Sequence, residues 1–210
     1  MKLKIIVGSI RPGRAADPVV AWVRAVAEQH PGFSDVEVLD LRDWRLPLFQ
    51  ENLETIGDFN DPTYSQPIVK RWNQTIASGD AFLFVTPEYN HSIPGVLKNA
   101  IDTVWLSGAF RNKPAGFVSY SYGLAAGTRA IEHLALIAIE TEMVPLRNTV
   151  LLPRVPGSFG EDGKPVDTMA HVALDILLED LDWWTRLLAQ ARSSAPAPGN
   201  SRIMDAMARG

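Results

Sequence analysis

The sequence predicts a doubly wound α/β domain, in which a parallel sheet carries helices on both faces. Three observations support this prediction. Short apolar runs of strand length alternate with longer segments whose apolar residues recur at helical spacing. The run Ala81–Val85 is apolar throughout, which is typical of a strand buried on both faces. The segments between strands are long enough for right-handed βαβ crossovers, so we expect three layers around five parallel strands.

The first half of the chain supplies three of these strands. The helix between the first two is indicated by Val19, Val23 and Val26, which return to one face every three or four residues. The elements expected here are a strand at Leu3–Val7, a helix at Asp17–His30, a strand at Val36–Leu41, a helix at Ile68–Ser78 and a strand at Ala81–Val85. The intervening segment Pro47–Pro67 is polar and rich in turn residues, which predicts a functional loop or lid.

The second half repeats the alternation and ends in a long helix. The elements expected here are a helix from about Pro94 to Leu106, a strand at Ala115–Tyr120, a helix from about Thr128 to Glu142, a strand at Val144–Leu151 and a helix from Val166 to about Ala191. The stretch Ser193–Asn200 has the Ser, Pro, Ala and Gly composition of a flexible linker. We therefore expect one domain over residues 1–192 and a flexible tail over 193–210.

Composition excludes several classes of function. The 210 residues include no cysteine, which excludes disulfides, thiolate metal sites and a thiol nucleophile. The four histidines are scattered singly, so no metal site is expected. A formal net charge of −4 gives no basic field for nucleic acid or an anionic membrane. No apolar stretch approaches the roughly 20 residues that span a bilayer, and we expect a cytoplasmic protein.

The loop after the first strand has the features of a phosphate site. Gly8–Asp17 opens directly into a helix, whose first N–H groups and positive dipole end attract anions. Ser9 adds a hydroxyl, and Arg11 and Arg14 add charged donors that can fork onto phosphate oxygens. The segment does not match the phosphate-binding motif of nucleoside triphosphatases, because no Lys and Ser or Thr follow Gly13. It does not match the G-x-G-x-x-G motif of dinucleotide-binding domains either, because the glycine spacing after Gly8 differs. Taken alone, the segment is equally compatible with an ordinary loop carrying two solvated arginines.

The loop after the third strand, Thr86–Asp102, is the most informative segment. It leaves the carboxyl end of a central strand, where ligands bind in open α/β sheets. Pro87 and Pro94 stiffen it, and Ser92 is predicted to cap the next helix. Gly95 allows a ligand to approach the backbone.

Together the two loops resemble those of the NADPH-dependent FMN reductases, a flavodoxin-like oxidoreductase family that also includes quinone and chromate reductases. The resemblance rests on Gly8–Arg11, Thr86–Asn90 and Pro94–Asp102. It covers roughly residues 1 to 150, including Pro47–Phe49 and Ala126–Ala130. The family's flavodoxin-like fold is therefore implied for this chain.

The resemblance also implies a set of cofactor-binding residues. The FMN phosphate would lie on Ser9, Arg11 and the backbone of residues 13–16, and the flavin ring against residues 87–90. The loop 119–123 would close the other side, and backbone N–H groups of residues 88–90 would face the ring's polar edge. The predicted cofactor-binding residues are Ser9, Arg11, Gly13, Arg14, Ala15, Ala16, Pro87, Glu88, Tyr89, Asn90, Ser119, Tyr120, Ser121 and Gly123.

The implied activity is hydride transfer from NADPH to bound FMN, and onward reduction of free FMN, a quinone or a similar small acceptor. No catalytic side chain is required, because the flavin carries the redox chemistry. The alternative is a flavodoxin-like electron-transfer module without NAD(P)H activity, although its usual strong acidity is missing here. A regulatory nucleotide-binding module on the same fold is a third hypothesis.

The resemblance further implies a homodimer or homotetramer with the flavin near a subunit boundary. His91, next to the proposed ring, is interpreted as a substrate-side or interface residue. The sequence selects neither the physiological acceptor nor NADPH over NADH, although the family favours the phosphorylated nucleotide.

Overall fold

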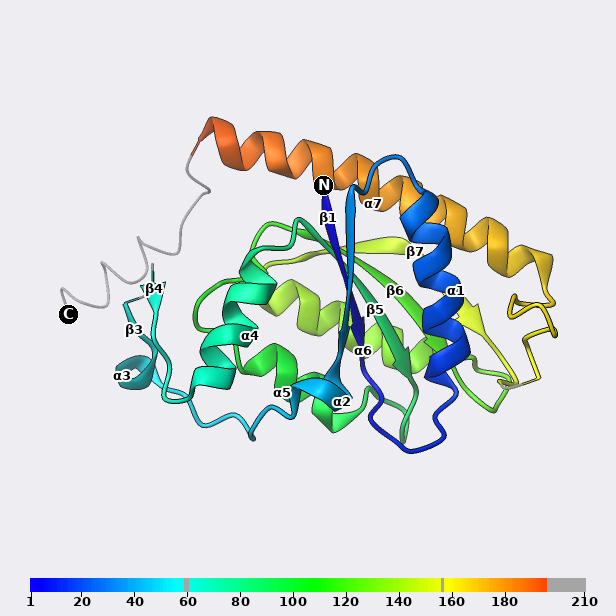
Figure 1. The fold of residues 1–210 in the computed structure, drawn as a ribbon, viewed down its shortest axis with the longest axis horizontal. Coiled ribbons are helices and arrows are strands. Elements are labelled where there is room, and N and C mark those ends of the chain that lie inside the picture. Colours follow the sequence, from blue (N-terminus) through cyan, green and yellow to red (C-terminus); the bar gives the residue numbers. More distant parts are fainter. Residues whose placement is uncertain (59–60, 156, 196–210) are drawn as a thin grey trace.

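The computed structural model describes residues 1–58, 61–155 and 157–195, and it confirms the expected α/β architecture (Figure 1). Five parallel strands form one sheet in the order β2-β1-β5-β6-β7. These strands are β1 (Lys2–Val7), β2 (Asp35–Asp40), β5 (Ala81–Pro87), β6 (Pro114–Tyr120) and β7 (Val144–Leu152).

Helices cover both faces of this sheet. Apolar side chains of α1 and α7 pack on one face, and those of α4, α5 and α6 pack on the other. The bounds are α1 (Ala16–Gln29), α4 (Pro67–Ala77), α5 (Gly95–Asp102), α6 (Thr128–Glu140) and α7 (Thr168–Ser194). In Figure 1, the long orange helix α7 runs along one side of the sheet. The three-layer prediction is therefore confirmed.

The two central strands explain why their sequences are apolar without alternation. Every residue of β5 and β6 is buried. Along β5, Leu83 and Val85 belong to the core beneath α1 and α7, whereas Phe82 and Phe84 belong to the core beneath α4, α5 and α6. Because side chains alternate between faces, a strand with helices on both sides has to be apolar at successive positions.

The described residues of the segment 47–67 contain more regular structure than the predicted loop. It contains the one-turn helix α3 (Leu53–Ile56) and the short antiparallel strands β3 (Gly57–Asp58) and β4 (Asp61–Pro62). The Asn52 side chain accepts hydrogen bonds from two N–H groups at the start of α3. These elements are too short to produce a recognisable hydrophobic period. Another short helix, α2 (Leu41–Trp44), directly follows β2.

Two other predicted boundaries are wrong. Helix α5 ends at Asp102 rather than near Leu106, because the N–H groups of Val104 and Trp105 bond three residues back and replace the helix by turns. The tail predicted from Ser193 begins too early, since α7 continues through Ser194. Residues 196–210, the rest of that predicted tail, lie outside the described residues. Within the described part, no helix has the length and apolar character needed to cross a membrane.

Candidate functional site

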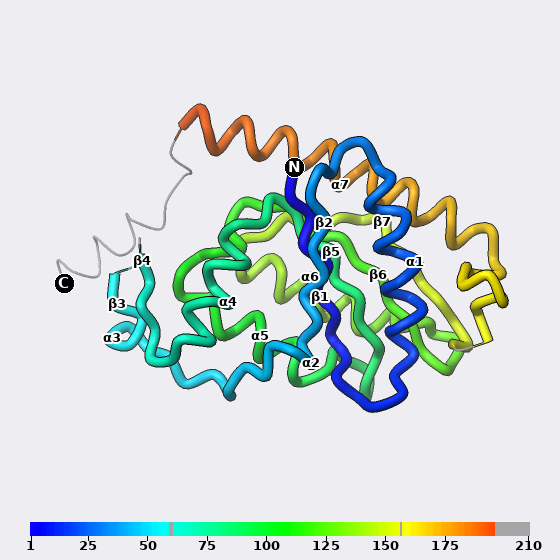
Figure 2. The backbone as a smooth tube through the Cα atoms, viewed as in Figure 1, coloured from blue at the N-terminus to red at the C-terminus, as the bar shows by residue number. Residues whose placement is uncertain are grey.

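Three loops meet at the carboxyl end of the sheet, after β1, β5 and β6. The loops after β1 and β5 turn at the same end of the molecule in Figure 2. The N–H of Gly8 donates to the carbonyl of Val85 at 2.9 Å, and the N–H of Glu88 donates to the carbonyl of Tyr120 at 3.3 Å. A side chain at Gly8 would approach Leu97 to 2.9 Å, so the first loop needs glycine to pack this closely. The three loops are thus fixed relative to one another.

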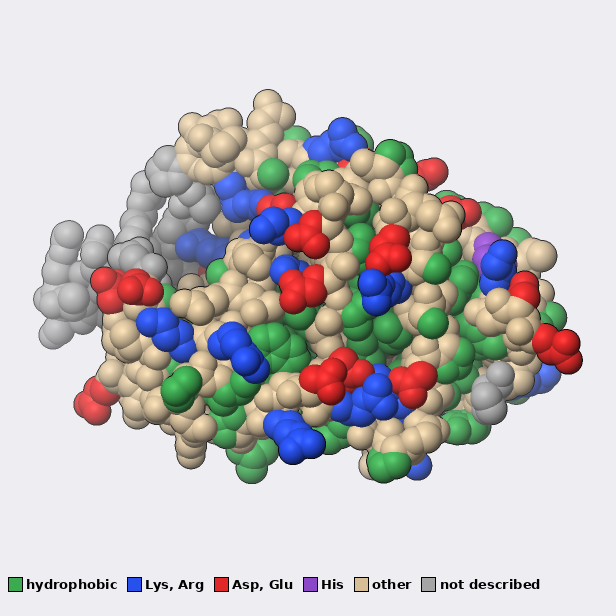
Figure 3. All heavy atoms as spheres, in the orientation of Figure 1, with side chains coloured by type: hydrophobic (Ala, Val, Ile, Leu, Met, Phe, Trp, Pro, Cys, Tyr) green, Lys and Arg blue, Asp and Glu red, His purple; other side chains and the backbone are tan. Residues whose placement is uncertain are grey.

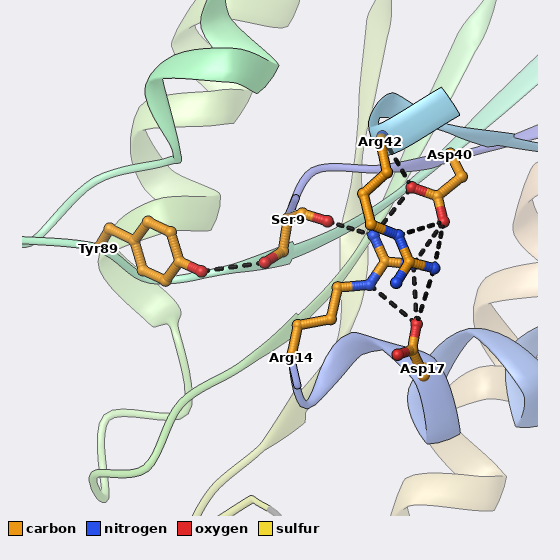
Figure 4. Close-up of polar contacts among 6 residues, drawn as sticks. All are labelled: Ser9, Arg14, Asp17, Asp40, Arg42 and Tyr89. Atoms are coloured by element: carbon orange, nitrogen blue, oxygen red, sulfur yellow. Dashed lines mark hydrogen bonds and ion pairs between the residues drawn. The ribbon is translucent and has the colours of Figure 1, made fainter. Parts of the chain in front are cut away.

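A side-chain bridge joins the first two loops. The hydroxyl oxygens of Ser9 and Tyr89 lie 3.0 Å apart. Figure 4 shows the two side chains pointing toward each other. The Arg11 guanidinium lies 5.7 Å from the centre of the Tyr89 ring, within cation–π range. Between the three loops lies a cavity of about 140 Å³, which we call the loop cavity. The structure therefore brings together loops that were predicted to act together.

Most of the predicted site residues line the loop cavity. Ten of them do so: Ser9, Arg11, Gly13, Arg14, Ala15, Pro87, Glu88, Tyr89, Tyr120 and Ser121. Sequence reasoning did not select Pro12 and Tyr122, which also line it. Pro12 lies between two predicted residues of the first loop, and Tyr122 lies between two predicted residues of the third loop. A prediction that took every residue of each loop would have included both.

The other four predicted residues lie outside the cavity lining. Ala16 is the buried first residue of α1, and Asn90 and Gly123 are exposed. Ser119 is fully buried and donates its hydroxyl to the carbonyl of Thr86 at 2.8 Å. The Ser119 side chain therefore ties β6 to β5 beneath the cavity.

The Arg14 side chain has a different role from the predicted phosphate contact. Only 3% of it is exposed, and its guanidinium pairs with Asp40 at the end of β2 and with Asp17 in the first turn of α1 (Figure 4). It also donates to the carbonyl of Ser9. These partners occupy all three nitrogen atoms of the guanidinium, so the side chain does not face a phosphate in the loop cavity. The guanidinium instead holds the first loop against β2, which leaves the Arg14 backbone at the cavity.

Asp40 is the centre of this cluster. It accepts hydrogen bonds from the guanidinium groups of Arg14 and Arg42 and from the N–H of Arg42. Burial alone would raise its pKa, but the hydrogen bonds from Arg14 and Arg42 outweigh burial and lower the pKa of Asp40 to about 2. The carboxylate is therefore ionised at neutral pH and compensates the buried arginine.

The turn after β5 is tight and unusual in conformation. Tyr89 and Ser92 exchange two backbone hydrogen bonds, and Asn90 and His91 between them both have positive φ, at 49° and 67°. These values are those of a type I′ turn. The predicted cap at Ser92 is wrong, because Pro94 occupies the N-cap position of α5 and makes no side-chain cap. The Ser92 hydroxyl instead lies 2.9 Å from His133 Nδ1.

Helix α6 holds the same turn through an ion pair. One terminal nitrogen of the Arg129 guanidinium, Nη2, contacts the Glu88 carboxylate. The other, Nη1, lies 2.9 Å from His91 Nε2. Only 6% of the Glu88 side chain is exposed, and its other carboxylate oxygen has no hydrogen-bond partner among the described residues. A buried carboxylate of this kind depends strongly on its remaining partner. Arg129 therefore helps to fix the position of the turn.

The loop cavity has the chemistry of an anion site. Helix α1 begins at its edge with no side-chain cap, so the N–H groups of its first turn are available to a ligand. Arg11 adds a positive charge. The hydroxyl of Tyr120 is buried without a hydrogen-bond partner among the described residues, and burial raises its pKa, so it is a neutral donor.

Comparisons with known proteins show which proteins this chain resembles. Residues 1–157 match the family model described as NADPH-dependent FMN reductase. An NAD(P)H-dependent FMN reductase of Pseudomonas aeruginosa is 33% identical over 193 residues, which cover 90% of this chain and 97% of that protein. A quinone reductase of Pseudomonas putida is 36% identical over 186 residues, covering 87% of this chain and 94% of its own length.

The fold has solved counterparts among flavoenzymes. The structure of FerB, a flavoenzyme NAD(P)H:(acceptor) oxidoreductase from Paracoccus denitrificans, aligns with a TM-score of 0.68 at 22% identity. The alignment covers 88% of this chain and 97% of FerB. At this level of identity the likeness shows the fold, and the flavodoxin-like prediction is confirmed.

Proposed function

Because this chain belongs to the NADPH-dependent FMN reductase family, we propose that it is an FMN-dependent oxidoreductase that takes a hydride from NADPH or NADH. It then reduces a small acceptor such as free FMN or a quinone. Relatives named as FMN reductases and quinone reductases support this assignment, and they do not favour the alternative of an electron-transfer module. The observation that carries the proposal is the loop cavity formed by the three loops after β1, β5 and β6.

The residues of the loop cavity fit the phosphate of FMN. The uncapped amino end of α1 offers backbone N–H groups from residues 13–16, and Ser9 and Arg11 add side-chain donors. We assign the phosphate to this end. Because its guanidinium is bound to Asp40, the Arg14 side chain positions the loop after β1. In this proposal only the backbone N–H of Arg14 contacts the phosphate.

The flavin ring belongs, in this proposal, between the turn after β5 and the loop after β6. Tyr89 and Tyr120 offer flat apolar surface and hydroxyl groups there. The N–H groups of Glu88 and Tyr89 are already bound to Tyr120 and Ser92 carbonyls, so they are not the ring donors that we expected. We assign that role to the N–H groups of Asn90 and His91 at the tip of the turn.

When bound, FMN supplies the redox chemistry, which is hydride acceptance from the nicotinamide and electron donation to a second acceptor. The protein then needs to hold the cofactor and leave one ring face accessible. The Ser9–Tyr89 bridge and the Glu88–Arg129 pair hold the two binding loops in place. Donors directed at the ring's polar edge stabilise the negative charge of the reduced state.

We further propose that the protein is a homodimer or homotetramer. Helix α6 presents Leu136 and Ile139, one turn apart, with 66% and 59% of each exposed. Trp105, after α5, is also half-exposed. Exposed apolar side chains grouped on one helix face are typical of an interface. We place the protein in the cytoplasm, where NADPH is regenerated.

Spectroscopy of the purified protein tests the proposed function. We expect flavin absorbance in the visible range, and rapid anaerobic bleaching of that absorbance on addition of NADPH without any protein partner. Stable colour in the presence of both NADPH and NADH would instead indicate an electron carrier. Failure to bind added FMN would contradict both functions.

Substitution of Arg11 tests the proposed phosphate contact. Arg11→Ala removes a charge-assisted donor, so we expect FMN affinity to fall by the equivalent of about 1.5 to 3 kcal/mol. Fluorescence titration of the flavin-free protein with FMN measures this change. Arg24→Ala is the matched control, since Arg24 pairs with Glu28 on the exposed side of α1. Equal FMN affinities of the Arg11 variant and the unmodified protein would disprove the contact.

A further inference from the structure

A second and larger hollow lies beside the loop cavity at the same end of the sheet. Its volume is about 710 Å³, and we call it the side hollow. One wall begins at Ile10, next to Ser9 of the loop cavity, and another is the first turn of α5, which follows the turn at Tyr89. A ligand in the side hollow would therefore be adjacent to the proposed flavin site.

The walls of the side hollow are held in place without a ligand. Asn99 on α5 donates its side-chain amide to the carbonyl of Pro47 at 2.8 Å and accepts from the N–H of Phe49 at 2.7 Å. These two bonds fix the backbone on either side of Leu48, which is 83% exposed at the rim. The apolar side chains of Ile10 and Val96 add to the lining. The side hollow thus offers a prebuilt apolar surface for a flat ligand.

The charged residues in the lining of the side hollow are Arg42 and Arg45, and their surroundings differ. Arg42 is paired with Asp40 and Asp17, which neutralise its charge. Figure 3 shows acidic and basic side chains side by side on the face over α2. Arg45, the residue after α2, is exposed and makes no hydrogen bond or ion pair with any described residue. Its charge is therefore available to an anionic ligand.

We propose that the side hollow binds the adenosine end of NADPH and that Arg45 contacts the 2′-phosphate. This inference rests on the proposed function, because it assigns a place to the hydride donor of that reaction. Adenine is flat and matches the apolar rim at Ile10 and Leu48, and the doubly charged phosphate matches the unpaired guanidinium. The nicotinamide end of the same molecule extends toward the loop cavity. Arg45 would make the protein prefer NADPH to NADH.

A binding measurement tests the inference without any turnover. Adenosine 2′,5′-bisphosphate carries the group that distinguishes NADPH, and adenosine 5′-monophosphate lacks it. We expect the FMN-loaded protein to bind the bisphosphate more tightly by calorimetry. The substitution Arg45→Asn should remove most of this advantage, with a loss of about tenfold or more. Asn is chosen because it tolerates the left-handed backbone at this position, where φ is 44°.

Two further variants test whether the effect depends on the positive charge at position 45. Arg45→Lys retains a charge and should recover part of the affinity, and Arg147→Ala, on β7, should change nothing. In steady-state kinetics, Arg45→Asn should raise the KM for NADPH at least tenfold. The KM for NADH, the kcat and the FMN content should be unaffected.

Failure of this inference and failure of the proposed function give different experimental results. Equal bisphosphate affinity in Arg45→Asn and the unmodified protein would overturn the inference, as would an equal loss for the monophosphate. A fall in affinity for free FMN alone would assign the side hollow to the acceptor and would also overturn it. Absence of flavin bleaching by either nucleotide contradicts the proposed function itself, whereas the bisphosphate titration still reports on the side hollow.

Discussion

At the scale of single residues, Arg14 is the buried charge that organises the first binding loop. Its guanidinium bonds to Asp40 on β2, to Asp17 on α1 and to the backbone of Ser9. Because the Arg14 side chain is almost fully buried, removal of Asp40, the more buried of its two carboxylate partners, leaves the charge poorly compensated in the interior. The geometry of the loop after β1 therefore depends on carboxylates that do not themselves line the loop cavity.

We predict that Asp40→Asn lowers the free energy of unfolding by about 3 kcal/mol at pH 7, because it breaks a buried ion pair. The unmodified protein should show a matching acid dependence. Since folding lowers the pKa of Asp40 from 3.8 to about 2, its contribution is fully present above about pH 5 and is lost progressively as the pH falls through the folded-state pKa, toward about pH 1. A shift of this size corresponds to about 2.5 kcal/mol, at about 1.4 kcal/mol per pKa unit. Urea unfolding at pH 7 and pH 3 measures both effects.

The control for this prediction is Asp17→Asn, since half of the Asp17 side chain is exposed. Its cost should be clearly smaller than that of Asp40→Asn. If both variants lose the same stability, or if the difference between Asp40→Asn and the unmodified protein does not shrink in acid, the assigned role of Asp40 is wrong.

Three of the residues predicted from the sequence, Ser9, Arg11 and Tyr89, line the loop cavity. They could be selected because each lies within a few residues of the end of a buried strand. Sequence reasoning could not assign Arg14, whose partner Asp40 lies 26 residues further along the chain. A local sequence pattern does not indicate which distant carboxylate will pair with a buried arginine. The same limitation applies to Glu88 and Arg129, which come from different elements.

At the scale of elements, periodicity was sufficient wherever an element is long and packed on the core. The strand predicted at Leu3–Val7 is observed at Lys2–Val7, and the strand predicted at Ala115–Tyr120 at Pro114–Tyr120. Periodicity failed in the segment 47–67, where β3 and β4 have two residues each and side-chain hydrogen bonds determine the structure. Elements of this length bury too little apolar surface to leave a sequence pattern.

The contact between α6 and the turn after β5 yields a prediction at this scale. Arg129→Met leaves the buried Glu88 carboxylate without a partner, so we expect a loss of about 3 kcal/mol in the free energy of unfolding. Glu88→Gln combined with Arg129→Met removes both charges and should recover much of this loss. Denaturant unfolding of the two variants measures the coupling between the residues.

Arg24→Met provides the comparison, because the Arg24–Glu28 pair is exposed and of the i,i+4 type, worth about 0.5 kcal/mol. A similarly small effect of Arg129→Met would show that the ion pair with Glu88 does not hold the turn.

At the scale of the whole molecule, the exposed apolar face of α6 is the surface to test for self-association. We predict that the unmodified protein is a homodimer or homotetramer in solution and that Leu136→Glu with Ile139→Glu reduces its mass to that of the monomer. Both side chains are exposed in the single chain, so far-ultraviolet circular dichroism should stay unchanged. Light scattering coupled to gel filtration gives the mass.

Leu187→Glu on α7 is the control, because Leu187 is also exposed but belongs to another face. A monomeric unmodified protein, or an unchanged mass in the α6 variant, would contradict an interface on α6.

The strand order also has a consequence for biosynthesis. In the nascent chain β1 can pair with β2 once about 40 residues have emerged, but its other neighbour, β5, is not made until residue 87. Until then Leu3, Ile5 and Val7 border an open hydrogen-bonding edge, which is the kind of surface that recruits other chains. A ribosome that stalls between these points would expose a segment prone to aggregate, and chaperones would have to shield it.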